Sequence, residues 1–153
     1  MDKPLSPLRA IVYGGAIVGM FDFAYATVLT LARGRPWYRP WQGVAYALLG
    51  PDAMNGGSWV IALGIVCHFI VAGSIATAFV LASRRLPLLT RHAVPVGMVY
   101  GAFVFFVMNW VVIPLTRIGR VPPFTTKILL LSLAVHVFLV GLPAALCARE
   151  AAP

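Results

Sequence analysis

The chain has 153 residues, of which 61% are hydrophobic and 10% are charged, and its formal net charge is +8. A soluble domain carries about 25% charged residues, so this composition excludes a soluble globular or disordered protein and indicates an integral membrane protein. The positive charge does not indicate nucleic-acid binding, because the basic residues flank the long apolar runs, where they anchor helix ends among lipid headgroups.

Four apolar runs predict four transmembrane helices. They cover residues 10–32, 58–82, 94–115 and 128–147. Each run has the ~20 residues that an α-helix needs to cross ~30 Å of hydrocarbon, and Asp22 is the only formally charged residue in any of them. Short connections after the second and third runs make those neighbours antiparallel. The sequence therefore predicts an all-α, four-helix bundle that forms a single integral membrane domain over residues 1–153.

The segment between the first two runs, residues 36–50, predicts an element at the membrane interface. Trp37, Tyr38 and Trp41 are amphipathic rings of the kind that anchor proteins at this depth. Apolar residues recur at helical spacing over Trp41–Leu49, which predicts a short helix lying in the membrane plane. An ordered aromatic loop that covers the end of the bundle is the alternative.

The basic residues divide equally between the two sides of this predicted bundle. One side carries Lys3, Arg9, Arg84, Arg85, Arg91 and Arg149, and the other carries Arg33, Arg35, Arg39, Arg117, Arg120 and Lys127. The excess of basic residues that marks the cytoplasmic side therefore gives no orientation. The double arginine in the very short second loop favours cytoplasmic termini, and we expect a multi-pass protein of the bacterial inner membrane.

The two halves of the chain are similar to each other. The aligned positions are Val12-Tyr13-Gly14 with Val99-Tyr100-Gly101, Asp22 with Asn109, His68 with His136, and Gly73 with Gly141. This alignment predicts two repeated helical hairpins related by an axis along the membrane normal, an arrangement that transporters use. Chance similarity between apolar helices is the alternative.

Four polar residues are predicted to converge inside the bundle: Asp22, His68, Asn109 and His136. An Asp at the bilayer centre costs ~2.5–3.5 kcal/mol, so such groups face the bundle interior and mark functional sites. One interpretation is structural, with hydrogen bonds between helices that contribute ~0.6–2 kcal/mol each. Another is a site for protons or a small solute, in which Asp22 and a histidine exchange a proton near neutral pH.

A b-type haem held by His68 and His136 is a third interpretation of the same residues. In it, Gly64, Gly73 and Gly141 leave room for the porphyrin. No other cofactor and no metal site is expected, because the two cysteines lie far apart and no zinc-binding spacing is present.

Small residues predict close helix packing at two places. The motifs are Gly15-x-x-x-Gly19 and Gly97-x-x-x-Gly101, which let helices approach each other within one bundle or between protomers. We therefore expect a homo-oligomer or a membrane complex, and an accessory or scaffold subunit is the alternative to a transporter. The sequence contains no catalytic motif, and no catalytic residue is predicted.

Helices two to four resemble the YagU-like proteins, a group of small bacterial inner-membrane proteins. The resemblance lies in His68-Phe69, Leu86-Pro87, the glycines Gly97 and Gly101, Met108-Asn109 ahead of Pro114-Leu115, and His136 in the last helix. The chain departs from that pattern at Asn109, where the YagU-like protein has histidine, and in its first loop. The resemblance implies an inner-membrane protein with a link to acid resistance, and it implies no catalytic residues.

Overall fold

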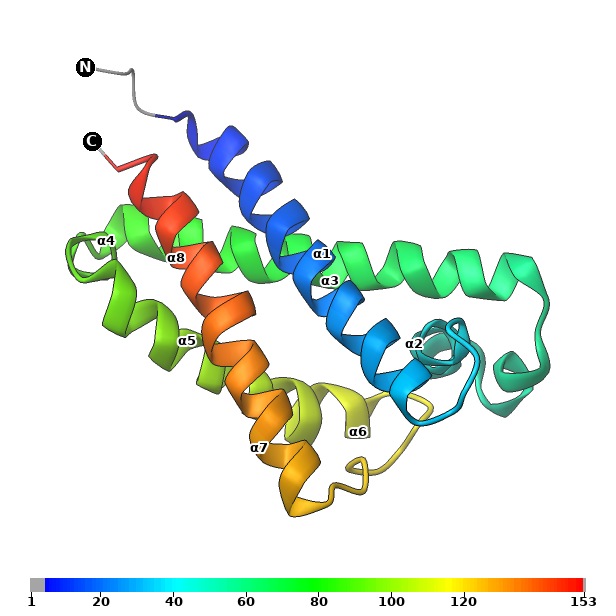
Figure 1. Ribbon diagram of the computed structural model, residues 1–153. Helices are drawn as coiled ribbons and strands as arrows, with labels where there is room; N and C mark the ends of the chain where they lie inside the picture. Colours follow the sequence, from blue (N-terminus) through cyan, green and yellow to red (C-terminus); the bar gives the residue numbers. More distant parts are fainter. Residues whose placement is uncertain (1–4, 153) are drawn as a thin grey trace.

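The computed structural model describes residues 5–152, and the regular structure in that range is helical (Figure 1). The α-helices are α1 (Pro7–Ala32), α2 (Arg39–Leu49), α3 (Ser58–Arg85), α4 (Leu88–Arg91), α5 (Ala93–Val107), α6 (Ile113–Leu115), α7 (Thr126–Val135) and α8 (Leu142–Arg149). A 3₁₀ turn, η1 (Pro51–Asn55), and two π-helical turns, η2 (Met108–Val112) and η3 (His136–Gly141), complete them.

Four continuous helices of the described chain are long and apolar enough to cross a membrane. They are Pro7–Ala32, Ser58–Arg85, Ala93–Leu115 and Thr126–Arg149. Every predicted boundary lies within three residues of the observed one. The all-α class and the four spans predicted from the sequence are therefore confirmed.

Local sequence explains where the first and fourth spans begin. The Ser6 hydroxyl accepts a hydrogen bond from the Arg9 amide, and Pro7 occupies the first turn, where its missing N–H costs nothing. The Thr125 hydroxyl accepts a hydrogen bond from the Ile128 amide in the same way.

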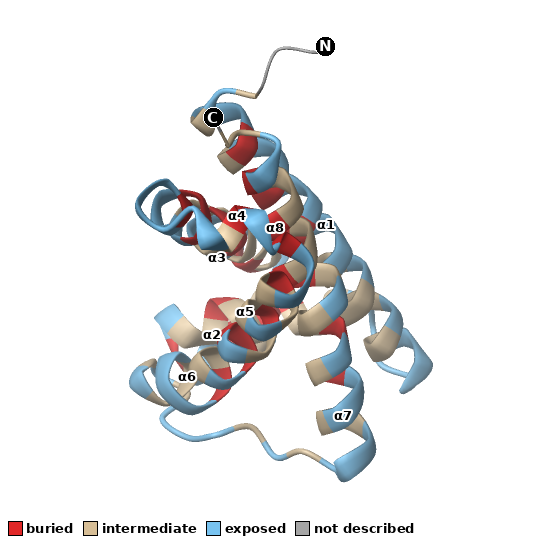
Figure 2. Ribbon diagram, turned by 90° about the vertical axis from the view of Figure 1, so that its left-hand side faces the viewer, coloured by how far each residue is buried: buried red, intermediate tan, exposed pale blue. Residues whose placement is uncertain are grey.

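The spans form two pairs that pack together. The first is α1 with α3, and the second is the α5–η2–α6 helix with the α7–η3–α8 helix; α1 also packs along α8. Figure 1 shows α3 crossing α1 at a steep angle, while α1 and α8 run side by side in Figures 1 and 2. The Leu5 amide donates to the Glu150 carbonyl over 2.8 Å, so both ends of the described chain lie at the same end of the bundle as α4.

Glycines set the closest approaches in both pairs. A Cβ added to Gly15 would lie 2.9 Å from the Gly73 Cα, and one added to Gly141 would overlap the backbones of Gly97 and Gly101. Gly19 lies against the Phe69 ring. Both small-residue motifs therefore pack inside one chain and are not available as surfaces between protomers.

These contacts shift the internal repeat by one residue. The sequence alignment places Gly14 on Gly101, but the residue that meets Gly73 is Gly15, whereas Gly101 meets Gly141. Gly14 instead faces Ala76 and Cys147. The sequence alignment of the two halves follows identical residues. In the folded chain, the alignment follows from which glycine faces the partner helix.

The segment between the first two spans forms α2, and one of its predicted roles is wrong. Trp41 was expected to anchor the protein at the interface, but it is 1% exposed and its ring stacks on Phe23 with centroids 4.2 Å apart. Its backbone carbonyl contacts Gly64 of α3, where a side chain would leave no room. Trp37 is exposed and Tyr38 is half-buried. The buried face of α2, with Gln42 and Ala45 beside Trp41, packs on α3 as part of the bundle.

Both π-helical turns lie just before a proline. Pro114 follows η2 and Pro143 follows η3. Proline removes one backbone hydrogen bond, and its ring crowds the carbonyl four residues earlier, so a wider turn there keeps the helix continuous. The sequence analysis did not predict these turns. They matter for the site because Asn109 and His136 lie in them.

Candidate functional site

A cavity of about 240 Å³ lies between the two helix pairs. The structure brings all four polar residues predicted to converge to its wall: Asp22 from α1, His68 from α3, Asn109 from η2 and His136 from η3. The rest of the wall is mainly apolar and includes Val18, Ala72, Ile75, Met108 and Val140. We call this space the polar cavity.

Asp22 and His68 form a pair across α1 and α3. The His68 Nε2 atom lies 2.9 Å from the Gly19 carbonyl oxygen, and Nδ1 lies 3.8 Å from the Asp22 Oδ2. A carbonyl can only accept a hydrogen bond, so Nε2 carries a hydrogen. The Nδ1 lone pair would repel a carboxylate, and the contact is favourable when one proton resides on Nδ1 or on the carboxyl. At 3.8 Å the two atoms are neighbours but are not hydrogen-bonded to each other.

The two members of the pair differ in exposure. The Asp22 side chain is 28% exposed and the His68 side chain 11%. Trp41 and Phe69 meet the His68 ring edge-on, with centroids 5.1 and 5.2 Å away, and Phe23 lies 6.3 Å away. Aromatic rings thus hold the imidazole in place, and the carboxyl is the more accessible of the two groups.

The polar residues of the second half bond to their own helices. The Asn109 Nδ2 donates to the Phe105 carbonyl over 2.9 Å, and the His136 Nδ1 lies 2.9 Å from the Ser132 carbonyl, each four residues earlier. Because the Ser132 carbonyl can only accept, His136 Nδ1 carries a hydrogen, and the Phe105 ring lies 5.2 Å from the imidazole. Neither side chain makes a hydrogen bond to another helix among the described residues.

A polar link that was not predicted from the sequence joins α1 and α7. The Tyr25 and Ser132 hydroxyls lie 2.7 Å apart, and Ser132 is buried. A signal for Ser132 was present, because it is a small polar residue one turn before His136. Tyr25 gives no comparable signal, since a tyrosine in a membrane helix is common without such a partner.

The packing around His68 and His136 leaves little room for a porphyrin. Two of the three glycines expected to leave room for it lie against backbone atoms instead: Gly64 against the Trp41 carbonyl and Gly141 against the Gly97 carbonyl, whereas Gly73 has open space beside it. Both nitrogens of His68 already face oxygen atoms. The cavity is also smaller than the ~300–1,000 Å³ that drug-sized ligands need. Within residues 5–152, no group of three or more His, Cys, Asp or Glu side chains could hold a metal ion.

No protein-family model matches this chain, and no curated protein or solved structure matches it either. The resemblance to YagU-like proteins stays a prediction, and the site is interpreted from its own geometry.

Proposed function

We propose that this chain is a membrane protein that takes up and releases protons at the Asp22–His68 pair. The observation that carries the proposal is the geometry of His68, whose Nε2 is held by the Gly19 carbonyl while Nδ1 faces the carboxyl of Asp22. Both residues lie inside spans long enough to cross the membrane. Placing a carboxyl there costs free energy, so such groups mark functional sites. Imidazole exchanges protons in the physiological range, which suits this exchange.

The polar cavity can hold a second species besides the proton. Asn109 and His136 line the same space, and each has a polar side-chain atom that its bond to Phe105 or Ser132 does not use. The cavity suits water or a small polar solute and is too small for a large ligand. We propose proton-coupled handling of such a solute, with Asp22 as the more accessible acceptor.

The membrane that holds the protein and its orientation there can also be proposed. We propose the bacterial inner membrane, with both termini on the cytoplasmic side, and the resemblance to YagU-like proteins supports this location. Labelling single cysteines introduced near Arg9 and Arg120 from outside intact cells tests the orientation. Only the cysteine near Arg120 should react; reaction near Arg9 alone would reverse the orientation.

We also propose that the protein works as a homo-oligomer or within a larger membrane complex. Its two glycine motifs are used inside the bundle, so the surface between protomers lies elsewhere. Native mass measurement in mild detergent should show more than one copy. A strictly monomeric protein across several detergents would contradict this.

A purely structural polar centre, in an accessory or scaffold subunit, is the second candidate. Its support is that His68 bonds to Gly19 of α1 and that Tyr25 bonds to Ser132 of α7, so polar groups join three helices. Asp22→Asn separates the two candidates. Asparagine keeps the size and the polarity of the carboxyl but cannot bind and release a proton.

Proton flux should be measured in vesicles that contain a pH-sensitive dye and the purified full-length protein. Asp22→Asn and His68→Gln are each expected to lower the flux at least about tenfold while the protein still folds, and His136→Gln should lower it less. The matched controls are Glu150→Gln and His92→Gln, which change an exposed acid and an exposed histidine outside the cavity and should leave the flux unchanged. Equal flux from wild type, Asp22→Asn and His68→Gln would reject the proton site and favour the structural role.

A further inference from the structure

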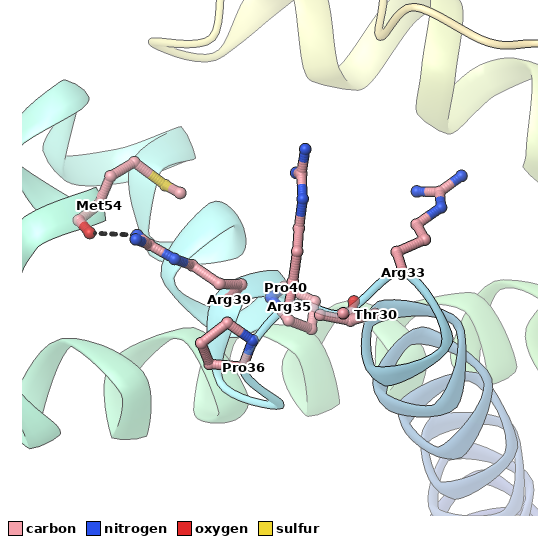
Figure 3. A pocket seen from close by; sticks show the side chains of 8 residues that line it. Thr30, Arg33, Arg35, Pro36, Arg39, Pro40 and Met54 are labelled. Atoms are coloured by element: carbon pink, nitrogen blue, oxygen red, sulfur yellow. Dashed lines mark hydrogen bonds between the residues drawn. The ribbon is translucent and has the colours of Figure 1, made fainter.

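Apart from the polar cavity, an open cavity lies at the opposite end of the bundle from the termini, where α1 turns into α2. It has a volume of about 550 Å³, and three arginines line it: Arg33, Arg35 and Arg39. Figure 3 shows Arg33 and Arg35 extending in the same direction from the turn, while Arg39 reaches toward Met54. We call this space the arginine basin.

The turn that carries these arginines is fixed by backbone hydrogen bonds. The Gly34 amide donates to the Leu31 carbonyl and the Arg35 amide to the Thr30 carbonyl, over 2.9 and 3.1 Å. Gly34 has φ +68°, a conformation that favours glycine, and this lets the chain reverse between Arg33 and Arg35. The two guanidinium groups are thus carried by one ordered turn.

Arg39 is oriented by its neighbours but retains free donors. Its Nη1 donates to the Met54 carbonyl over 2.7 Å and to the Gln42 Oε1 over 3.2 Å. A guanidinium has five N–H groups, so Nη2 and Nε stay available to a ligand. The orientation lowers the entropy cost of binding at this arginine.

No carboxylate of the described chain neutralises the basin. The ion pairs within residues 5–152 are His68–Asp22 and Arg149–Glu150, and no acidic side chain lines the basin. Three positive charges therefore face one open space without an internal counter-ion. Planar guanidinium groups bind phosphate oxygens through pairs of N–H donors, so phosphate is an anion that these arginine side chains suit.

We propose that Arg33, Arg35 and Arg39 bind a phosphate group of an anionic ligand. The basin lies where the apolar α1 ends and beside exposed Trp37, the depth of lipid headgroups in a membrane. The phosphate therefore comes either from an anionic phospholipid or from a free phosphate compound at the membrane surface. This site is separate from the polar cavity and does not depend on the proton-handling proposal.

Binding should be measured by calorimetric titration of the purified full-length protein in non-ionic detergent. The probes are dihexanoyl-phosphatidylglycerol and inorganic phosphate. Binding of both, in competition, identifies the phosphate group alone as the ligand, whereas binding of the lipid only identifies a headgroup site. Both results support the proposal, and binding of neither probe overturns it.

The deciding variant is Arg33→Gln/Arg35→Gln, because neither guanidinium makes a hydrogen bond within the described chain and folding should not depend on them. We expect affinity to fall about tenfold or more. The matched control is Arg84→Gln/Arg85→Gln, which removes two exposed arginines from the end of α3 and should change affinity less than about twofold. Equal losses in the two variants would show general charge attraction and overturn the site.

Discussion

The pair α1 with α3 and the pair α5 with α7–α8 place aligned polar residues on the wall of one cavity but use them differently. In the first pair both helices are uninterrupted, and His68 of α3 bonds to α1 and faces Asp22. In the second pair both helices contain a π-helical turn ahead of a proline, and Asn109 and His136 bond to their own helices. A shared polar pattern thus gives a contact between helices in one half and a local contact in the other.

The difference teaches that backbone geometry decides what a polar side chain in a membrane can reach. A π-helical turn changes the direction in which side chains leave the helix, and the proline that follows it makes that turn favourable. The first half has no proline inside its spans beyond the first turn of α1. Its polar side chains therefore keep regular helical spacing and meet across the interface.

The largest expected effect concerns the aligned glycines Gly73 and Gly141. An added methyl at Gly141 would overlap the backbones of Gly97 and Gly101, whereas at Gly73 it has open space. Gly141→Ala should lower the free energy of unfolding by about 3 kcal/mol or more, and Gly73→Ala should change it little or raise it by about 0.5 kcal/mol. Unfolding in mixed detergent micelles measures both, and similar losses would mean that the two pairs pack equally tightly.

The second effect compares the two histidines. His68→Leu removes a bond between helices and leaves Asp22 without its partner, which should cost about 2 kcal/mol. His136→Leu removes a bond within one helix and should cost about 0.5 kcal/mol. The same unfolding measurement applies, with His92→Leu as the exposed control. A larger loss for His136→Leu would reverse the roles of the two halves.

A smaller effect is expected at the π-helical turns. Pro143→Ala restores a backbone donor next to η3, so amide hydrogen exchange over residues 136–143 should slow several-fold, equivalent to about 1 kcal/mol. Pro7→Ala is the control, because proline is tolerated in the first turn of α1 and exchange there should stay the same. Unchanged exchange around residue 140 would show that packing, and not the proline, maintains the turn.

The smallest effect is at the link between the two pairs. Tyr25→Phe removes the hydroxyl that lies 2.7 Å from the Ser132 Oγ, and it should cost about 0.6 kcal/mol. A double-mutant cycle with Ser132→Ala measures the coupling between the two hydroxyls, expected at a similar size. Tyr100→Phe is the control, since the Tyr100 hydroxyl donates to the Ile75 carbonyl and has no part in the cycle. Additive losses for Tyr25→Phe and Ser132→Ala would show that this contact contributes nothing.

The spans and the meeting of the polar residues could be predicted from the sequence for a physical reason. Twenty consecutive apolar residues have few stable places outside a membrane, and a side chain such as Asp22 or His68 among them must face the interior. The burial of Trp41 could not be predicted in this way. Its ring suits an interface as well as a core, and only its stacking on Phe23 decides between them.

The π-helical turns and the shift of the repeat by one residue could not be predicted from the sequence either. Pro114 indicates only that the helix is disturbed, because a kink, an ending and a widened turn are all compatible with a proline. Which glycine faces its partner depends on the crossing of two whole helices, so Gly14 and Gly15 look equivalent until both helices are in place.

The position of Trp41 has a consequence for the order in which the protein is made. Its ring stacks on Phe23, which is synthesised earlier, but its backbone rests on Gly64, which is synthesised later. Until α3 has been synthesised, α2 lacks the helix on which most of its buried face packs. Docking of α2 must therefore wait until α3 has entered the bilayer, and during that interval the nascent chain presents an unburied tryptophan to the insertion machinery.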